Sequence, residues 1–494
     1  MEMKLSLHKA PVDRLKTDLA VAVVDPDTTL YDVREPELGK VLDRIRKGFK
    51  DERLKREVFH SFGPKSPVQN LLVFSTSLSS SYNIWENVKI FAARSLGYAR
   101  DYGLKRIAFL LNHKEGAPFV GKVAEGFVLG DYRFDKYKSK KSGGEALSVS
   151  LVVRPEDFTV SKARIERYKA VSEEINDCRD IVNEPGAAFY PDTMARLARR
   201  IATKHQLGCT ILNEKQLERQ GYNGLIEVGK GSVHPPRMII LRYKPTRKSS
   251  GHLALVGKGI TFDTGGLSLK SAEGMGSMKG DMAGGAAVLY AMAAIARLKP
   301  AASVTGIIAT AENFPGPKAQ RPGDIFVAKN GKSIVVDNTD AEGRLVLTDA
   351  LERAKEEKAT HIVDIATLTG SCVHALGNGM AGIMGNNPAL IQAVIQCGQN
   401  HGETFWELPL PDEYKEMLKT PYADINNVGG KVAGAITAGL FLREFVPEGA
   451  AWAHLDIAGP FIVEKKWKYY TEGGTAFGLK TMVDLAEHFK EYLG

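Results

Sequence analysis

Cysteine is scarce in this sequence, and no long apolar run is present. The 494 residues include four cysteines and no CxxC pair, so neither a disulfide framework nor a thiolate zinc site is expected, and reduced thiols suit a cytoplasmic protein. The least polar run, 283–296, has 14 residues and is too short to cross a bilayer. The N-terminus lacks the apolar segment of a signal peptide. Membrane, secreted and fibrous classes are therefore excluded as leading interpretations.

The net charge of +8 is confined to the first third of the chain. Residues 1–165 contain 29 Lys and Arg against 21 Asp and Glu, whereas the remaining 329 residues contain 37 of each. The densest basic stretch holds Lys136, Lys138, Lys140 and Lys141. A basic face for a polyanion such as DNA is one interpretation. The stretch has no aromatic periodicity and ends in Gly-Gly, so a solvated loop is favoured over nucleic-acid binding.

Composition and periodicity predict an α/β protein of more than one domain. Hydrophobic residues make up 44% and charged residues 25%, as in ordinary globular proteins. In the first third, strands are expected at 19–24, 70–74, 106–111 and 147–153, and helices at 38–49 and 84–102. Apolar residues then recur every three or four positions between Ile165 and Cys178, which indicates a connecting helix ending at the breaker cluster 183–186.

A second α/β region follows Tyr190. Strands are expected at 253–256, 304–309, 333–336, 362–365 and 452–456, and helices at 283–298, 344–357, 432–445 and 476–492. We therefore predict an N-terminal α/β domain (1–160), a connecting helix (161–186) and a larger C-terminal domain (187–494). Each domain is expected to be a sheet flanked by helices, with a mixed central sheet in the larger one.

Chemistry-bearing residues follow the strand expected at 253–256. A buried strand would deliver Lys258 and Asp263 to its carboxyl end, the usual ligand crevice of an open α/β sheet. Positive φ angles near a ligand are expected at Gly257, Gly259, Gly265 and Gly266. Asp281, just before the helix expected at 283–298, is either a helix N-cap or a ligand.

A second acidic cluster lies between the strand expected at 333–336 and the helix expected at 344–357. Asp340 and Glu342 are two residues apart, so in an extended loop both side chains emerge on the same side. Beside Asp263 and Asp281 they would form a group of four carboxylates, which repel one another strongly at close range. A divalent cation is the natural counter-ion, and a structural ion-pair network with Lys258, Lys270 and Arg344 is the alternative.

These residues and their neighbours resemble the leucyl aminopeptidases of the M17 metallopeptidase type, also called cytosol aminopeptidases. All eight positions of the signature NTDAEGRL are present at 338–345. Similar blocks are VGKGITFDTGGLSLK (256–270), MKGDMAGGAAV (278–288), ENFPGPKAQRPGDI (312–325), DIATLTG (364–370) and VAGAITAGLFLREFV (432–446). The resemblance extends from about residue 183 to the C-terminus, and the N-terminal third is compatible in length and α/β alternation.

The resemblance implies a catalytic C-terminal domain that hydrolyses the N-terminal residue of peptides, with Leu and other apolar residues preferred, by a two-metal-activated hydroxide. It implies one metal held by Lys258, Asp263, Asp281 and Glu342, and a second held by Asp263, by the side chain and main-chain oxygen of Asp340, and by Glu342. Lys258 would bind as a neutral amine, its pKa driven down by burial and by the metal. None of the eleven histidines falls in these blocks, and an oxygen-rich set suits Zn²⁺ or Mn²⁺, with Mg²⁺ also allowed.

The resemblance also implies roles outside the metal ligands. Lys270 would donate to the developing oxyanion, and Arg344 would hold a bicarbonate ion that serves as general base. Pairing of Arg344 with Asp340 or Glu342 in the first helical turn is the alternative. The side-chain pocket would be lined by Met278, Thr367 and Leu368, although core packing would explain the same residue types. A cytoplasmic homohexamer acting on peptide substrates is expected.

Two sites depart from the family pattern, and two other motifs only partly match nucleotide-binding motifs. Gly280 and Ala283 stand where a bulkier residue and a differently ordered small-residue run are expected, and 459–461 (GPF) replaces small or polar residues, so local packing and pocket shape should differ. The GxGxxG match at 377–382 lacks the acidic residue that would bind a ribose, and 251–258 has the wrong spacing for a P-loop, so nucleotide binding is not expected.

Overall fold

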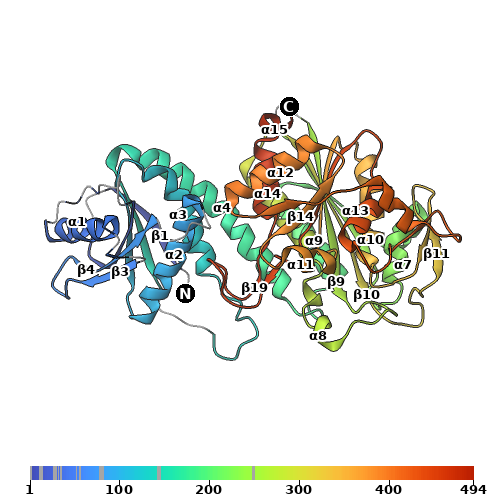
Figure 1. Cartoon of the computed structure of the whole chain (residues 1–494), viewed down its shortest axis with the longest axis horizontal. Coiled ribbons are helices and arrows are strands. Elements are labelled where there is room, and N and C mark those ends of the chain that lie inside the picture. The colour runs from blue at the N-terminus through green and yellow to red at the C-terminus, as the bar shows by residue number, and fades with distance from the viewer. Residues whose placement is uncertain are drawn as a thin grey trace. The chain divides into compact units, whose positions relative to one another are not determined.

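The computed structural model of the chain describes residues 3–9, 15–25, 31, 33, 36–51, 53–54, 57–76, 83–141, 146–246 and 251–494. The chain divides into two compact units, Met1–Glu173 with Lys465–Thr471, and Glu174–Glu464 with Glu472–Gly494 (Figure 1). The division falls within one long helix, α4 (Phe158–Asn183). That helix ends at the predicted breaker cluster, while the domain boundaries at 160 and 186 remain a prediction.

The first unit is built on a six-stranded sheet in the order β1-β6-β5-β2-β4-β3, parallel except where β3 meets β4. Its strands are β1 (Lys4–Lys9), β2 (Thr17–Val24), β3 (Glu57–Ser61), β4 (Val68–Ser75), β5 (Arg106–Leu111) and β6 (Ser148–Val153). Its helices are α1 (Pro36–Lys50), α2 (Ile84–Asp101), α3 (Val120–Gly130) and the first part of α4. The predicted α/β alternation is confirmed, with two additional edge strands, β1 and β3.

Both faces of the central strand β2 are buried, as a parallel sheet covered by helices requires. Leu19 and Val21 lie in a core with side chains of α2 and α3, whereas Ala20 and Ala22 lie in a separate core with side chains of α1. Successive residues therefore serve opposite faces of the sheet. The edge strands β1 and β3 are half-exposed and rich in polar residues. In β1, Leu5 and Leu7 alternate with polar residues and pack against the core, as in a half-buried strand.

The second unit is built on an eight-stranded mixed sheet in the order β15-β14-β17-β13-β9-β10-β8-β7. Its strands are β7 (Gly208–Leu212), β8 (Arg237–Tyr243), β9 (His252–Asp263), β10 (Ser303–Asn313), β13 (His361–Ala366), β14 (Ala381–Gly385), β15 (Phe405–Glu407) and β17 (Ala451–Asp456). The four strands β17, β13, β9 and β10 run parallel, so their carboxyl ends meet at one edge. The predicted mixed central sheet is confirmed.

Helices flank this sheet, and short strands form two small additional sheets (Figure 1). The helices are α5 (Pro191–His205), α6 (Glu214–Gln220), α7 (Asn223–Gly229), α8 (Ala272–Met275), α9 (Ala283–Leu298), α10 (Glu342–Glu356), α11 (Gly370–Leu376), α12 (Pro388–His401), α13 (Gly434–Arg443), α14 (Leu479–Glu487) and α15 (Phe489–Leu493). The short strands are β11 (Asp324–Val327), β12 (Ser333–Val336), β16 (Ile425–Asn426), β18 (Ile462–Val463) and β19 (Gly473–Gly474). The single helix predicted at 476–492 is wrong, because His488 leaves the helical conformation between α14 and α15.

Helix α9 is strongly apolar. The segment Met278–Leu298 is, by length and composition, long and apolar enough to cross a membrane, but 83% of its 18-residue apolar stretch is buried inside the structure. Gly257 of β9 allows this burial, because a Cβ at that position would lie 2.6 Å from the Cα of Gly285 in α9. The positive φ angles predicted for Gly257 and Gly259 are therefore wrong, since both lie in the strand. Those predicted for Gly265 and Gly266 are confirmed (φ 85° and 63°).

Helix α10 covers the sheet with Leu347, Ala350, Leu351 and Ala354, all fully buried as the amphipathic pattern predicts. The same helix carries a buried carboxyl group, Asp349, which accepts a hydrogen bond from the backbone N–H of Leu225 at 2.7 Å. Burial raises the pKa of Asp349 to about 8, although the backbone hydrogen bonds from Leu225 and Gly224 act to lower it.

We expect Asp349→Asn to change how stability depends on pH. Because the pKa of Asp349 is higher in the folded chain than its unfolded value of about 3.9, its stabilising effect is complete below about pH 4 and is lost as the pH rises toward 8. An amide does not titrate, so the variant lacks this pH dependence. Between roughly pH 5 and pH 7, the free energy of unfolding of the wild type should therefore fall relative to that of the variant by about 1.4 kcal/mol per pH unit. Urea unfolding of both proteins at pH 5, 6 and 7 checks this. Parallel pH profiles would show that Asp349 titrates normally.

Candidate metal centre

A register shift in β9 affects the direction of the side chains that the strand carries to the site. Ala311 of β10 pairs with Ile260, but Glu312 pairs with Phe262, so β9 contains one extra residue at this point. Strict alternation would turn Lys258 and Asp263, which are five residues apart, to opposite faces of the sheet. The extra residue restores a common face, and such bulges often re-aim side chains beside functional sites. Asp263 ends β9, as predicted, whereas Lys258 lies inside the strand.

Lys258 is 3% exposed and is surrounded by oxygen atoms. Its Nζ lies 2.7 Å from Asp281 Oδ2 and 2.8 Å from Glu342 Oε1, and it donates to the carbonyl of Thr367 at 3.0 Å. Burial opposes the positive charge, but Asp281, Glu342 and Asp263 outweigh it and raise the pKa of Lys258. Burial alone therefore does not produce the neutral amine expected from the sequence.

Gly343 permits the close approach of Lys258 to α10. A Cβ at Gly343 would lie 2.7 Å from both Cε and Nζ of Lys258. Any side chain at this position of the NTDAEGRL signature would therefore displace the lysine from Glu342 and Asp281.

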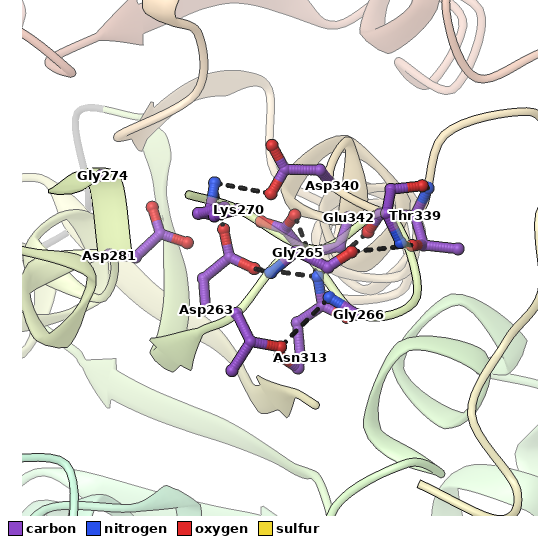
Figure 2. A network of polar contacts seen from close by, with 12 residues as sticks. Asp263, Gly265, Gly266, Lys270, Gly274, Asp281, Asn313, Thr339, Asp340 and Glu342 are labelled. Carbon is purple, nitrogen blue, oxygen red and sulfur yellow. Dashed lines mark hydrogen bonds and ion pairs between the residues drawn. The ribbon is translucent and has the colours of Figure 1, made fainter. Parts of the chain in front are cut away.

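Lys270 lies against the other side of the acidic group. Its Nζ is 2.8 Å from Asp263 Oδ2 and 2.5 Å from Asp340 Oδ1, and Figure 2 shows it beside both carboxylates. Burial disfavours its charge, but the neighbouring carboxylates, above all Asp263, raise the pKa of Lys270. Two ammonium groups thus contact the acidic cluster from different elements.

Three of the four predicted acids converge, and the fourth, Asp281, is linked to Glu342 through Lys258; the arrangement fits a cation. Ligand oxygens of Asp263, Asp340 and Glu342 all lie within 4.8 Å of one another. Burial raises the pKa values of Asp281, Glu342 and Asp340. Four carboxylates against two ammonium groups leave a formal charge of minus two. Buried carboxylates are stabilised by added positive charge, so divalent ions suit this donor set.

The local structure excludes one of the two interpretations of Asp281 and differs from the extended loop expected around Asp340 and Glu342. Asp281 is not a helix cap, because α9 begins at Ala283 with Met282 before it and no side-chain cap hydrogen bond. Asp281 instead accepts a 2.7 Å hydrogen bond from the hydroxyl of Thr367. Glu342 is the first residue of α10 rather than part of an extended loop. The start of this helix, not an extended backbone, therefore places its side chain relative to Asp340.

Arg344 lies in the first turn of α10 and is 7% exposed. Its Nη1 donates to the carbonyl of Asn427 at 2.7 Å, and its buried Nε has no hydrogen-bond partner. No ion pair joins Arg344 to Asp340 or Glu342, all three being within the described part of the chain. Burial lowers the pKa of Arg344 to about 10, so it remains a cation at neutral pH. A buried guanidinium with a free donor fits a small planar anion.

The three predicted pocket residues have different surroundings. Thr367 contacts Asp281 and Lys258 directly, as described above. Met278 begins a short 3₁₀ helix before Asp281 and is half-buried. Leu368 is partly buried against the large core of the unit, and its backbone N–H donates to Asp456 at 3.1 Å. Their role in binding a substrate side chain remains a prediction.

Two departures from the family pattern lie in contact with each other. A Cβ at Gly280 would lie 2.5 Å from Cε2 of the Phe461 ring. The ring therefore occupies the space that a bulkier residue before Asp281 would need, and the two departures compensate for each other in packing.

The two nucleotide-like motifs do not have the local structure of a nucleotide site, and the basic stretch is exposed. The sequence 377–382 runs from the end of α11 into β14, which is helix before strand, and 251–258 lies mainly in β9. Neither provides the strand-to-helix turn that a nucleotide site needs. Residues 136–141 form an exposed loop, as favoured, in which Lys141 donates to the carbonyls of Asp135 and Lys136. Its two following glycines lie outside the described residues.

Polar residues that the sequence analysis does not single out hold the site together. Asn313, Thr339 and Asn427 hydrogen-bond to the loops that carry the acids. All three are buried, but only Thr339 adjoins a predicted acid in the sequence, so Asn313 and Asn427 give no comparable sequence signal.

Comparisons with known proteins agree with this geometry. The model of the cytosol aminopeptidase family, catalytic domain, matches residues 176–483. A probable cytosol aminopeptidase of Solibacter usitatus is 45% identical over 389 residues, which cover 78% of this chain and 80% of that protein. One from Alkaliphilus metalliredigens is 36% identical and covers 99% of this chain and 100% of that protein.

Two solved structures extend the similarity over nearly the whole chain. The bottromycin maturation enzyme BotP in complex with Mn has a TM-score of 0.83 and 30% identity, covering 96% of this chain and 100% of that one. A mutant of tomato leucine aminopeptidase has a TM-score of 0.85 and 29% identity, and the match covers 99% of this chain and 97% of that one. The chain therefore belongs to the cytosol aminopeptidase family, a family of metal-dependent peptidases.

Proposed function

We propose that the protein removes N-terminal residues, preferentially Leu and other apolar residues, from peptides with the help of two divalent ions. The observation that carries the proposal is the convergence of Asp263, Asp340 and Glu342 around two lysines at the carboxyl edge of the sheet. Lys258, Asp263, Asp281 and Glu342 would hold one ion. Asp263, Asp340 and Glu342 would hold the other, with Asp263 and Glu342 shared. Zn²⁺ and Mn²⁺ suit these ligands, and Mg²⁺ is also allowed.

Bound ions would lower the pKa of water and polarise the carbonyl of the first peptide bond. The residues of the chain supply the remaining functions. Lys270 carries a positive charge beside the acids and would donate a hydrogen bond to the oxygen that becomes negative in the transition state. Arg344, through its unpartnered Nε, would hold a bicarbonate ion as general base. Thr367 fixes Asp281 through its hydroxyl.

Substrate selection and assembly follow from the same resemblance. Met278, Thr367 and Leu368 would line the pocket for the substrate's first side chain, and their largely apolar surfaces favour Leu or Met there. We further propose a cytoplasmic homohexamer, which analytical ultracentrifugation would detect as a species of about six times the 53.9 kDa chain mass.

We expect the purified protein to hydrolyse leucine p-nitroanilide in the presence of Mn²⁺. Removal of metal with a chelator should lower the rate by at least about 100-fold, because the acids alone cannot activate water, and added Mn²⁺ should restore it. N-acetyl-leucine p-nitroanilide, which lacks the free α-amine, is the matched substrate and should not be cleaved. A rate that is unchanged by the chelator, or equal for both substrates, would contradict the proposal.

A further inference from the structure

Asn313 ends β10 directly beside Asp263, and it is 4% exposed. Its carbonyl accepts hydrogen bonds from the backbone N–H of Thr264 at 3.0 Å and from the hydroxyl of Thr264 at 2.7 Å. The backbone of Asn313 is therefore fixed to the loop that follows Asp263. Its side chain points into the acidic cluster (Figure 2).

The side-chain amide of Asn313 faces three oxygen atoms. Its Nδ2 donates to Asp263 Oδ1 at 2.8 Å and to the carbonyl of Thr339 at 3.0 Å, and it lies 3.4 Å from Glu342 Oε2. Carboxylates and carbonyls only accept, so the amide must present its nitrogen to them; the reverse orientation would place oxygen against oxygen. The amide is thus a donor that contacts both carboxylates proposed to be shared.

Close packing holds the amide in this orientation. A Cβ at Gly266, where φ is 63°, would lie 2.7 Å from Oδ1 of Asn313. Glycine at this position therefore leaves the room that the amide oxygen occupies. The Thr339 hydroxyl, which donates to the carbonyl of Gly265 at 2.7 Å, fixes the loop before Glu342 to the loop after Asp263.

We propose that Asn313 is a positioning residue that sets the spacing of Asp263 and Glu342 for two divalent ions. Without the amide, Asp263 keeps its hydrogen bond from the backbone N–H of Gly265 and its ion pair with Lys270, and Glu342 keeps its ion pair with Lys258. The donor that contacts both carboxylates at once is lost. The inference rests on the proposed function, since it assigns Asn313 to the same site. Partners that orient metal ligands in this way typically contribute 10- to 100-fold in metal affinity.

The test is Mn²⁺ binding to metal-free Asn313→Ala, measured by isothermal titration calorimetry. We expect affinity to fall by about 10- to 100-fold. The serine variant keeps one hydroxyl donor and should bind with intermediate affinity, and it carries the test if the alanine variant does not fold. Asn386→Ala is the control, because the Asn386 amide likewise makes two hydrogen bonds, at 2.7 and 3.0 Å. Its partners are backbone groups at the amino end of β17, whereas Asp263 and Asn313 end their strands. It should bind Mn²⁺ like the wild type, whatever its melting temperature.

The outcomes separate the two proposals. A folded Asn313→Ala or Asn313→Ser protein that binds Mn²⁺ within twofold of the wild type overturns the role of Asn313 and leaves the aminopeptidase proposal intact. An equal loss in Asn386→Ala would also overturn it, by showing a general effect of destabilisation. A wild-type protein that neither binds Mn²⁺ nor hydrolyses leucine p-nitroanilide overturns both.

Discussion

Replacement of Glu342 by alanine is expected to abolish the hydrolysis of leucine p-nitroanilide. Glu342 is buried, its Oε1 lies 2.8 Å from Lys258, and it is one of the two carboxylates proposed to be shared by the ions. If loss of an ion removes at least about 4 kcal/mol of transition-state stabilisation, the rate falls by about 10³-fold or more. Calorimetry should show fewer than two Mn²⁺ ions bound per chain.

The fold should survive this substitution. Lys258 keeps Asp281 as its partner at 2.7 Å, so removal of Glu342 does not leave a buried, unpaired charge. The matched control is Glu352→Ala on the same helix, a poorly exposed glutamate whose ion pair with Lys355 lies outside the site. It should retain full activity. Full activity of Glu342→Ala, with circular dichroism showing an intact fold, would contradict the assignment of the acidic cluster.

The position of Asp263 follows from features that a sequence displays. Asp263 ends a buried strand, and Glu342 begins an amphipathic helix after another strand. The carboxyl end of a strand in an open parallel sheet is the usual ligand edge, which accounts for Asp263. Glu342 instead follows β12, which belongs to the separate three-stranded sheet, so its approach to Asp263 could be expected from the family resemblance but not from the parallel-sheet rule. Every predicted strand overlaps an observed strand, and every predicted helix other than the single helix at 476–492 overlaps one observed helix, because the apolar periodicity of these segments is strong.

The way in which the acids are held does not follow from the sequence. The register shift that turns Lys258 and Asp263 to one face involves a single extra residue in β9, which leaves no trace in composition. The amide of Asn313 acquires its role only because three segments meet around it. The grouping of Lys465–Thr471 with the first unit is equally hidden, since it depends on contacts distant in sequence.

The pairing of Gly280 with Phe461 illustrates the same limit. Each residue on its own reads as a departure that puts local packing in question. The structure shows that the aromatic ring takes up the room left by the missing side chain. Two separate irregularities in the sequence are therefore one compensated contact, which only the three-dimensional arrangement can reveal.

Lys270→Ala is expected to separate catalysis from metal binding. Lys270 contacts Asp263 and Asp340 but is not among the proposed ligands, so its removal takes one positive charge from the acidic cluster and should leave Mn²⁺ affinity equal to or higher than that of the wild type. The kcat for leucine p-nitroanilide should nevertheless fall by about 10²- to 10³-fold, the usual effect of removing one donor to a developing oxyanion. KM should change much less, because the interaction forms in the transition state.

The comparison with Glu342→Ala makes this prediction decisive. Lys329→Ala is the matched control, because Lys329 has a similar side-chain exposure (21% against 19%) and also pairs with a carboxylate, Glu356, at 2.9 Å. It should change neither kcat nor metal affinity. If Lys270→Ala loses Mn²⁺ together with activity, Lys270 serves mainly to organise the acids. If it keeps kcat within a few-fold of the wild type, charge development on the substrate is stabilised by other groups. Only retained metal with lost turnover identifies Lys270 as the oxyanion donor.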